Sequence, residues 1–209
     1  MPRPSILKIS EVFTSVQGEG LRQGQPTIFV RLAGCNLRCA FCDTKYAWKE
    51  GKDREVGDIM AQIEGLRRNF PADWICLTGG EPFLQNIGPL ARRLRKAGLP
   101  IQIETNGTLY RRIPFDWLTI SPKPPRYAVR SEWTRRAREV KLVAGRSLSF
   151  DVLRDVRAAF PAATPVLIQP QSCAAWSARK AFRLLEHALA EGLPNIRLSS
   201  QLHKIHNLN

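Results

Sequence analysis

Short runs rich in β-branched and aromatic residues alternate along this chain with segments whose apolar residues recur at helical spacing. The expected strands are residues 27–32 and the runs within "WICLTGGEP", "PIQIETNG", "WLTISPKPP", "REVKLVAG", "TPVLIQP" and "NIRLSS". The expected helices are Val56 to Leu66, Leu84 to Ala97, the segment from an N-cap at Ser149 through Phe160, and Ser177 to Leu193. This alternation predicts an α/β fold with a parallel sheet.

The chain is short for a closed barrel of this kind. About seven strands in 209 residues fall below a complete eightfold barrel, which typically takes about 250 residues. No convincing amphipathic helix lies between Ile103 and Leu118 or between Ile120 and Val140. We therefore expect one domain over residues 1–209, folded as an incomplete TIM-type parallel barrel with shortened or missing crossover helices.

Polar motifs follow most of the expected strands. They are residues 35–44, "TGGEP", "ETNGT", "SPK" and "QPQS". Because active sites of parallel barrels lie at the carboxyl ends of the strands, these motifs should converge on one face.

Composition sets limits on location and partners. No window approaches the roughly 18 apolar residues of a membrane span, and the first residues lack the apolar region of a signal peptide. Five unevenly clustered cysteines fit a reducing compartment, so we expect a cytoplasmic protein. The net charge of +14 suits nucleic acid, an anionic membrane surface or an anionic substrate. Since no nucleic-acid motif accompanies it, we interpret the charge as a solvated basic surface.

Three cysteines, Cys35, Cys39 and Cys42, follow the first expected strand with the spacing C-x3-C-x2-C. A structural zinc site is closed by four protein ligands, and we interpret the remaining Cys76 and Cys173 as ordinary buried cysteines. A 4Fe-4S cluster held by three thiolates leaves one iron open for a substrate or cofactor. A short irregular loop can wrap three corners of such a cube, so the spacing favours a cluster.

These cysteines, with Phe41 before Cys42 and "TGGEP" at 78–82, resemble the signature of the radical S-adenosylmethionine (SAM) superfamily. The segments "EVFTSVQGEG", "PTIFVRLAGCNLRCAFCDT", "QIETNGT", "SPK", "IQP" and "RLSSQLHK" resemble the 7-carboxy-7-deazaguanine synthase family of queuosine biosynthesis over nearly the whole chain. The resemblance implies a carbon-nitrogen lyase that converts 6-carboxy-5,6,7,8-tetrahydropterin to 7-carboxy-7-deazaguanine with loss of ammonia. It also implies a 4Fe-4S cluster, SAM, Mg²⁺, an electron donor such as flavodoxin or ferredoxin, and a homodimer.

The same resemblance implies roles for individual residues. Cys35, Cys39 and Cys42 would bind the cluster, and Thr44 would bind Mg²⁺. SAM would be held by Phe41, Cys42, Asp43, Gly80, Ser121, Pro122, Lys123, Gln169, Pro170, Gln171 and Ser172. The substrate would meet Val16, Gln17, Gly18, Arg31, Thr78, His203 and Asn209, with a tail of about residues 200–209 closing its site. A charge at Arg31 is expensive to bury unpaired within "IFVRLAG", which also points to a substrate carboxylate.

Plainer readings stay open for several of these residues. Phe41 could only pack against the barrel, "TGGEP" and "SVQGEG" could be turns, and "SPK" and "QPQS" could be loops that end strands. Thr44 alone reads as a turn residue, and a lone histidine such as His203 is more often structural. The tail departs from the family ending at Leu202 and His206.

Two rival functions also stay open. A radical-SAM activase shares the cysteine spacing but acts on a glycine of a partner protein. A basic zinc-binding RNA adaptor would bind zinc and cleave no SAM.

Overall fold

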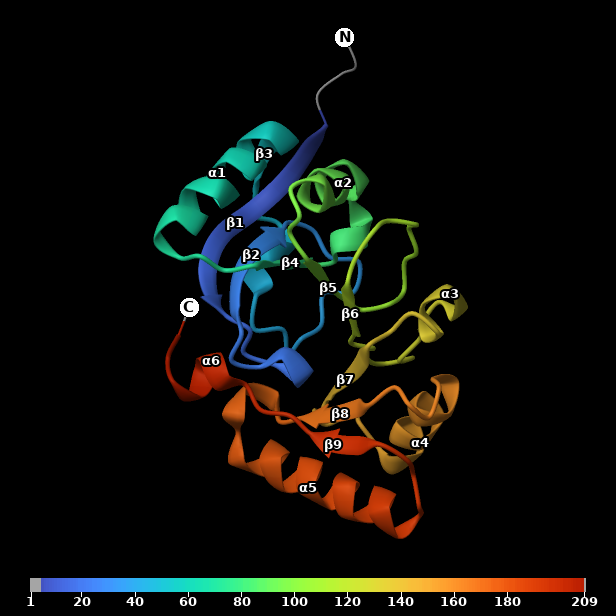
Figure 1. Ribbon diagram of the computed structural model, residues 1–209. Coiled ribbons are helices and arrows are strands. Elements are labelled where there is room, and N and C mark those ends of the chain that lie inside the picture. The colour runs from blue at the N-terminus through green and yellow to red at the C-terminus, as the bar shows by residue number, and fades with distance from the viewer. Residues whose placement is uncertain (1–4, 209) are drawn as a thin grey trace.

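The computed structural model describes residues 5–208, which form one curved sheet with the longer helices on its outer side (Figure 1). The strands are β1 (Ile6–Val16), β2 (Pro26–Leu32), β3 (Lys52–Glu55), β4 (Trp74–Gly79), β5 (Ile101–Thr105), β6 (Trp117–Ile120), β7 (Glu139–Val143), β8 (Val166–Gln169) and β9 (Ile196–Leu198). Their order is β3-β1-β2-β4-β5-β6-β7-β8-β9. Neighbours from β2 to β9 are parallel, while β1 pairs antiparallel with β2 and β3. The sheet stays open between its end strands β3 and β9, so the predicted partial barrel is confirmed.

The longer helices are α1 (Val56–Asn69), α2 (Gly88–Lys96), α4 (Phe150–Ala159) and α5 (Ala175–Ala190), and the one-turn helices are α3 (Ser131–Thr134) and α6 (Leu202–Ile205). Short 3-10 turns are η1 (Gly20–Arg22), η2 (Lys45–Trp48), η3 (Pro82–Leu84) and η4 (Gln171–Cys173). As predicted, the β5–β6 crossover has no helix and the β6–β7 crossover has only α3. No helix within residues 5–208 is long and apolar enough to cross a membrane.

The two-residue period of the strands divides the sheet into an apolar outer face and a more polar inner face. Alternate residues such as Ile103, Leu118 and Val140 are fully buried in one cluster with the helices. Their neighbours along the same strands point inward and include Glu104 and Lys141. The hydrophobic core therefore lies between the sheet and its helices, and the barrel interior is free to hold polar groups.

The connection between β1 and β2 lies inside the curve of the sheet (Figure 1). The N–H of Leu21 in η1 donates to Glu139 of β7 at 2.7 Å, and Arg22 donates to Gln102 of β5 at 2.5 Å. The segment "SVQGEG" enters the connection of the β1–β2 hairpin, as its plainer interpretation as a turn suggests, and the residues that follow it link this hairpin to β5 and β7.

Several expectations about the elements were wrong. The strand at 27–32 is the second and not the first, because β1 precedes it, and the sheet has nine strands rather than about seven. The second helix begins at Gly88 rather than near Leu84, which lies in η3. Glu81 accepts a hydrogen bond from the Phe83 N–H and so closes η3 as a separate turn before α2.

The last long helix begins at Ala175 and ends at Ala190 instead of spanning Ser177 to Leu193. Ser149 does cap α4, since its hydroxyl accepts from the Val152 N–H. Cys76 is buried as expected, but Cys173 is exposed, so the expectation of a buried Cys173 was wrong. Ser172 and Cys173 both have left-handed backbone angles in η4.

Candidate active site

A cavity of about 250 Å³ opens at the carboxyl ends of the parallel strands. Its wall includes each of the five polar motifs that follow the strands, so their predicted convergence is confirmed. The wall contains every residue assigned to the site except Pro122 and Asn209. Pro122 is buried outside the wall, and Asn209 lies outside the described residues.

The cysteine loop after β2 brings Cys35, Cys39 and Cys42 to this cavity. Burial raises the pKa of the Cys39 thiol, the Lys123 ammonium lowers it, and the neighbouring Cys35 and Cys42 thiols raise it further. The pKa of Cys39 therefore depends on both neighbouring thiols as well as on Lys123. Within residues 5–208, no three His, Cys, Asp or Glu side chains are placed to hold one metal ion. A cubane spreads its thiolates more widely than a single ion does, so this donor set fits a three-thiolate cluster better than closed zinc.

Gly79 and Gly80 bring the end of β4 against the start of the cysteine loop. A Cβ at Gly79, whose φ is +138°, would lie 2.2 Å from the Leu32 carbonyl oxygen, and one at Gly80 would lie 2.0 Å from the Gly34 carbonyl oxygen. The Gly80 N–H donates to Leu32 at 3.1 Å. Both glycines line the cavity, but their first requirement is this close approach between backbones.

Glu81 connects the motif "TGGEP" after β4 to the motif "ETNGT" after β5. Its buried carboxylate accepts from the Thr105 hydroxyl at 2.7 Å and from the Asn106 N–H at 2.8 Å. Burial raises the pKa of Glu81, and these donors together with the Phe83 N–H oppose that rise. The loops after β4 and β5 are therefore held as one piece.

Arg31 projects from β2 into the cavity wall and is already paired. Its Nε lies 2.6 Å from Oε1 of Glu11 on β1, and its guanidinium lies 5.5 Å from the centre of the Phe13 ring. Glu11 therefore already compensates the Arg31 charge, so the cost of an unpaired charge no longer points by itself to a substrate carboxylate. The Tyr46 hydroxyl also donates to Glu11 at 2.6 Å, which leaves this carboxylate well held beside Arg31.

Thr44 lies at the edge of the cysteine loop, with its Oγ1 at 3.5 Å from the Cys42 sulfur. Its side chain does not cap the η2 turn that follows. The hydroxyl is therefore available to the cavity, where it offers one neutral oxygen.

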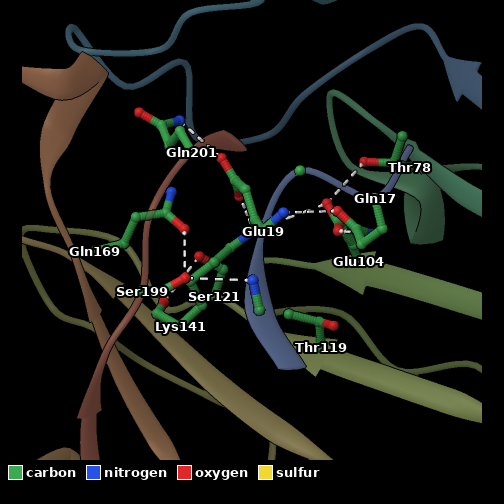
Figure 2. Close-up of polar contacts among 12 residues, drawn as sticks. Gln17, Glu19, Thr78, Glu104, Thr119, Ser121, Lys141, Gln169, Ser199 and Gln201 are labelled. Atoms are coloured by element: carbon green, nitrogen blue, oxygen red, sulfur yellow. Dashed lines mark hydrogen bonds and ion pairs between the residues drawn. The ribbon is translucent and has the colours of Figure 1, made fainter. Parts of the chain in front are cut away.

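An ion pair between Glu19 and Lys141 crosses the inner side of the cavity (Figure 2). Burial alone would raise the pKa of Glu19, but the Lys141 ammonium and the Gln201 amide lower it to about 2. Burial disfavours the charged form of Lys141, but the carboxylates of Glu104, Glu19 and Glu139 raise its pKa above the ordinary value. Both groups are therefore ionised over the whole neutral range.

The C-terminal segment lies over the β1–β2 connection. The Leu202 N–H donates to the Gly18 carbonyl at 2.8 Å, and Gln201 Nε2 donates to Glu19 Oε1 at 2.7 Å. His203 packs so closely on Gly18 that a Cβ there would lie 2.0 Å from the imidazole Nδ1. A side chain at position 18 would therefore force the His203 imidazole out of its place.

The prediction of the site missed three charged residues that line the cavity, Glu19, Glu104 and Lys141. Each lies next to an assigned motif or within an apolar strand. The signal that selected Arg31, a charge inside an apolar strand, would also have selected Glu104 in "PIQIETNG" and Lys141 in "REVKLVAG".

A loop of three cysteines after the first parallel strand of a partial barrel, facing a glycine turn at the next strand, defines the radical SAM class. Residues 29–140 match the family model described as the Radical SAM superfamily. Members of this class carry a 4Fe-4S cluster and SAM.

Comparison with individual relatives shows which family of the radical SAM superfamily this chain resembles. The 7-carboxy-7-deazaguanine synthase of Escherichia coli (strain K12) is 36% identical over 227 residues, covering 96% of this chain and 98% of the relative. The synthase of Rhodospirillum rubrum is 53% identical over 112 residues, a match that spans 52% of this chain and only 46% of the relative. The crystal structure of QueE from Escherichia coli superposes with a TM-score of 0.79 and 32% identity over 95% of both chains. This chain belongs to the 7-carboxy-7-deazaguanine synthase family.

Proposed function

We propose that this chain is a radical SAM carbon-nitrogen lyase that converts 6-carboxy-5,6,7,8-tetrahydropterin to 7-carboxy-7-deazaguanine with loss of ammonia, a step of queuosine biosynthesis. The observation that carries the proposal is one cavity whose wall joins the three-cysteine loop to an arginine, two carboxylates and amide side chains. Such a wall can hold a cofactor on one side and a small polar heterocycle on the other.

The cofactor side is formed by loops after the strands. Cys35, Cys39 and Cys42 would hold the cluster, and the loops around Gly80, Lys123 and Gln169 would hold SAM. When bound, the cluster and SAM supply the one-electron chemistry that removes a hydrogen atom from the substrate. The Lys123 side chain is itself held in position, because its ammonium donates to the Ser121 carbonyl at 2.7 Å.

The substrate side is formed by the hairpin, β2 and β4. Arg31, held by Glu11, would bind the pterin carboxylate through its remaining N–H groups. Gln17 donates to Glu104 at 3.0 Å and Thr78 lies 3.5 Å from the same carboxylate, so these side chains form one hydrogen-bonding surface. Thr44 would contribute a single oxygen to Mg²⁺, with the substrate and water supplying the rest.

The wider assignments belong to the same proposal. The tail of about residues 200–209, including His203, would close the substrate site within a single domain. An electron donor such as flavodoxin or ferredoxin would reduce the cluster, and the enzyme would act as a cytoplasmic homodimer.

Anaerobic reconstitution with iron and sulfide tests this function. The protein should gain a 4Fe-4S spectrum, cleave SAM under reduction, and convert the carboxylated tetrahydropterin. Cys35→Ala, Cys39→Ala and Cys42→Ala should each abolish SAM cleavage, whereas Cys76→Ala and Cys173→Ala should retain it. A colourless protein that contains zinc would rule out the assignment of a 4Fe-4S cluster. SAM cleavage with no conversion of the pterin would rule out the pterin as the substrate.

A further inference from the structure

Lys141 places a buried positive charge on the inner wall of the cavity (Figure 2). Its side chain is 7% exposed, forms an ion pair with Glu19 and lies 3.9 Å from Oε2 of Glu104. Buried ion pairs rarely stabilise a fold more than apolar residues of similar volume would. A lysine at this position therefore calls for a role other than packing.

The two carboxylates that Lys141 joins also contact neutral donors. Glu19 accepts from Gln201 Nε2 at 2.7 Å, and Glu104 accepts from Gln17 Nε2 at 3.0 Å. The other end of the Gln201 amide, its Oε1, is buried and has no hydrogen-bond partner within residues 5–208. A buried acceptor without a partner is costly, so this corner of the wall is suited to a ligand that brings N–H donors.

We infer that Lys141 is a positioning residue that holds Glu19 and Glu104 as ionised acceptors for the N–H groups of the pterin's 2-amino-4-oxopyrimidine ring. The inference rests on the proposed function, because it takes the pterin as the substrate. An ionised carboxylate only accepts hydrogen bonds, and such charge-assisted bonds to ring N–H and amino groups are strong. Lysine has no acceptor, so Lys141 acts through the carboxylates.

The charges around this pair determine what removal of Lys141 would do. Lys141 faces Glu19 from the hairpin, Glu104 from β5, Glu139 from its own strand and Lys123 from the loop after β6. Glu19 also faces His203 of α6. Without the Lys141 ammonium, burial would raise the pKa of Glu19 against only the Gln201 hydrogen bond and the charge of His203. The protonated carboxyl would then lose acceptor capacity as the pH falls.

The test measures the affinity of the reconstituted full-length enzyme for 6-carboxy-5,6,7,8-tetrahydropterin between about pH 5 and about pH 7. We expect Lys141→Met to weaken binding by about tenfold or more at the acidic end, and to recover affinity as the pH rises. Lys141→Arg, which keeps the charge, should reproduce the pH dependence of the wild type. Because the three proteins share every titratable group except the one at position 141, the difference between the Met and Arg variants isolates the effect on the carboxylates.

Lys180→Met is a matched control, because Lys180 donates to the backbone carbonyls of Gly145 and Arg146 outside the cavity. It should bind the pterin as the wild type does. Cluster content and uncoupled SAM cleavage report whether each variant is folded. If Lys141→Met does not fold, Glu19→Gln replaces the ionised carboxylate by a neutral amide with a single acceptor oxygen, and it should weaken pterin binding by itself.

Equal affinities and parallel pH profiles for Lys141→Met and the wild type would overturn the inference, as would undiminished binding by Glu19→Gln. A uniform loss of affinity in Lys141→Met at every pH would also overturn it, because a purely structural lysine predicts that result. Failure of the wild type to bind the pterin would instead count against the proposed function.

Discussion

The ammonium of Lys204 donates a 2.5 Å hydrogen bond to Oδ2 of Asp43, across 161 residues of sequence. It also lies 3.4 Å from the Ser172 hydroxyl in the loop after β8. The end of the chain is therefore fastened to the cysteine loop on one side of the cavity, while Gln201 and Leu202 fasten it to the hairpin on the other. A structural change that loosens the tail should therefore also loosen the cysteine loop, and the reverse.

Lys204→Ala should loosen the tail without much loss of global stability. The ion pair is partly exposed, with 24% and 46% of the two side chains accessible, so its contribution should stay below about 1 kcal/mol. Hydrogen exchange at the amides of α6 should speed up, and added salt should reproduce part of this effect in the wild type. Lys49→Ala, which removes an exposed lysine at the end of η2, should leave α6 unchanged. Equal exchange in both variants would show that Lys204 does not hold the tail.

Arg31→Ala should weaken binding of the carboxylated tetrahydropterin by about 2 to 5 kcal/mol, because a charge-assisted pair in a partly buried site is lost. The same variant should bind a tetrahydropterin that lacks the 6-carboxylate nearly as the wild type does. Glu11→Gln should cause a smaller loss, since Arg31 keeps its charge but loses its 2.6 Å partner. If Arg31→Ala weakens both ligands equally, Arg31 shapes the wall and does not recognise the carboxylate.

Thr44→Ala should reduce the stimulation of turnover by Mg²⁺ while the cluster and uncoupled SAM cleavage remain. One neutral oxygen binds Mg²⁺ poorly, so metal and substrate should each raise the affinity of the other by the same factor. Pterin affinity measured with and without Mg²⁺ checks this, and Thr44→Ser should behave as the wild type does. Equal affinities in the wild type would mean that Thr44 only ends the cysteine loop.

The Glu19–Lys141 pair predicts a loss of stability in acid. Because the folded protein lowers the pKa of Glu19 from 4.5 to about 2, the unfolded chain binds the proton more readily between these values. The contribution of Glu19 is present above about pH 4.5 and is lost as the pH falls through about 2, at a cost of the order of 1 to 3 kcal/mol. Denaturant midpoints measured across this interval should fall less steeply for Glu19→Gln. Parallel slopes would contradict the lowered pKa.

The parts of the fold that sequence could predict are those with a repeating apolar pattern. In "PTIFVRL" and "WICLTG" the outward residues are buried against helices, and that burial produces the strand signal. By contrast β3, "KDRE", has no apolar residue, and only backbone pairing with β1 makes it a strand. The sequence of such an edge strand has no apolar pattern from which the strand could be predicted.

The candidate site likewise has a part that sequence could predict and a part that it could not. Motifs that end strands could be placed together, because parallel strands bring their carboxyl ends to one edge. The pairing of Arg31 with Glu11 depends on the register of β1, where a bulge lies between Ile9 and Glu11. The contact between Glu19 and Lys141 joins segments 122 residues apart. No local pattern encodes either distance, so these partners emerge only from the folded chain.

The close backbone contact at Gly79 and Gly80 has a consequence for how natural variation in this chain should be interpreted. Any side chain at either position would collide with Leu32 or Gly34 before SAM entered the cavity. A descendant that had lost all affinity for SAM would still need both glycines in order to fold. Retention of this pair during evolution is therefore evidence for the architecture of the barrel, and evidence for an intact cofactor must come from positions such as Asp43 or Gln169, where the backbone imposes no such demand.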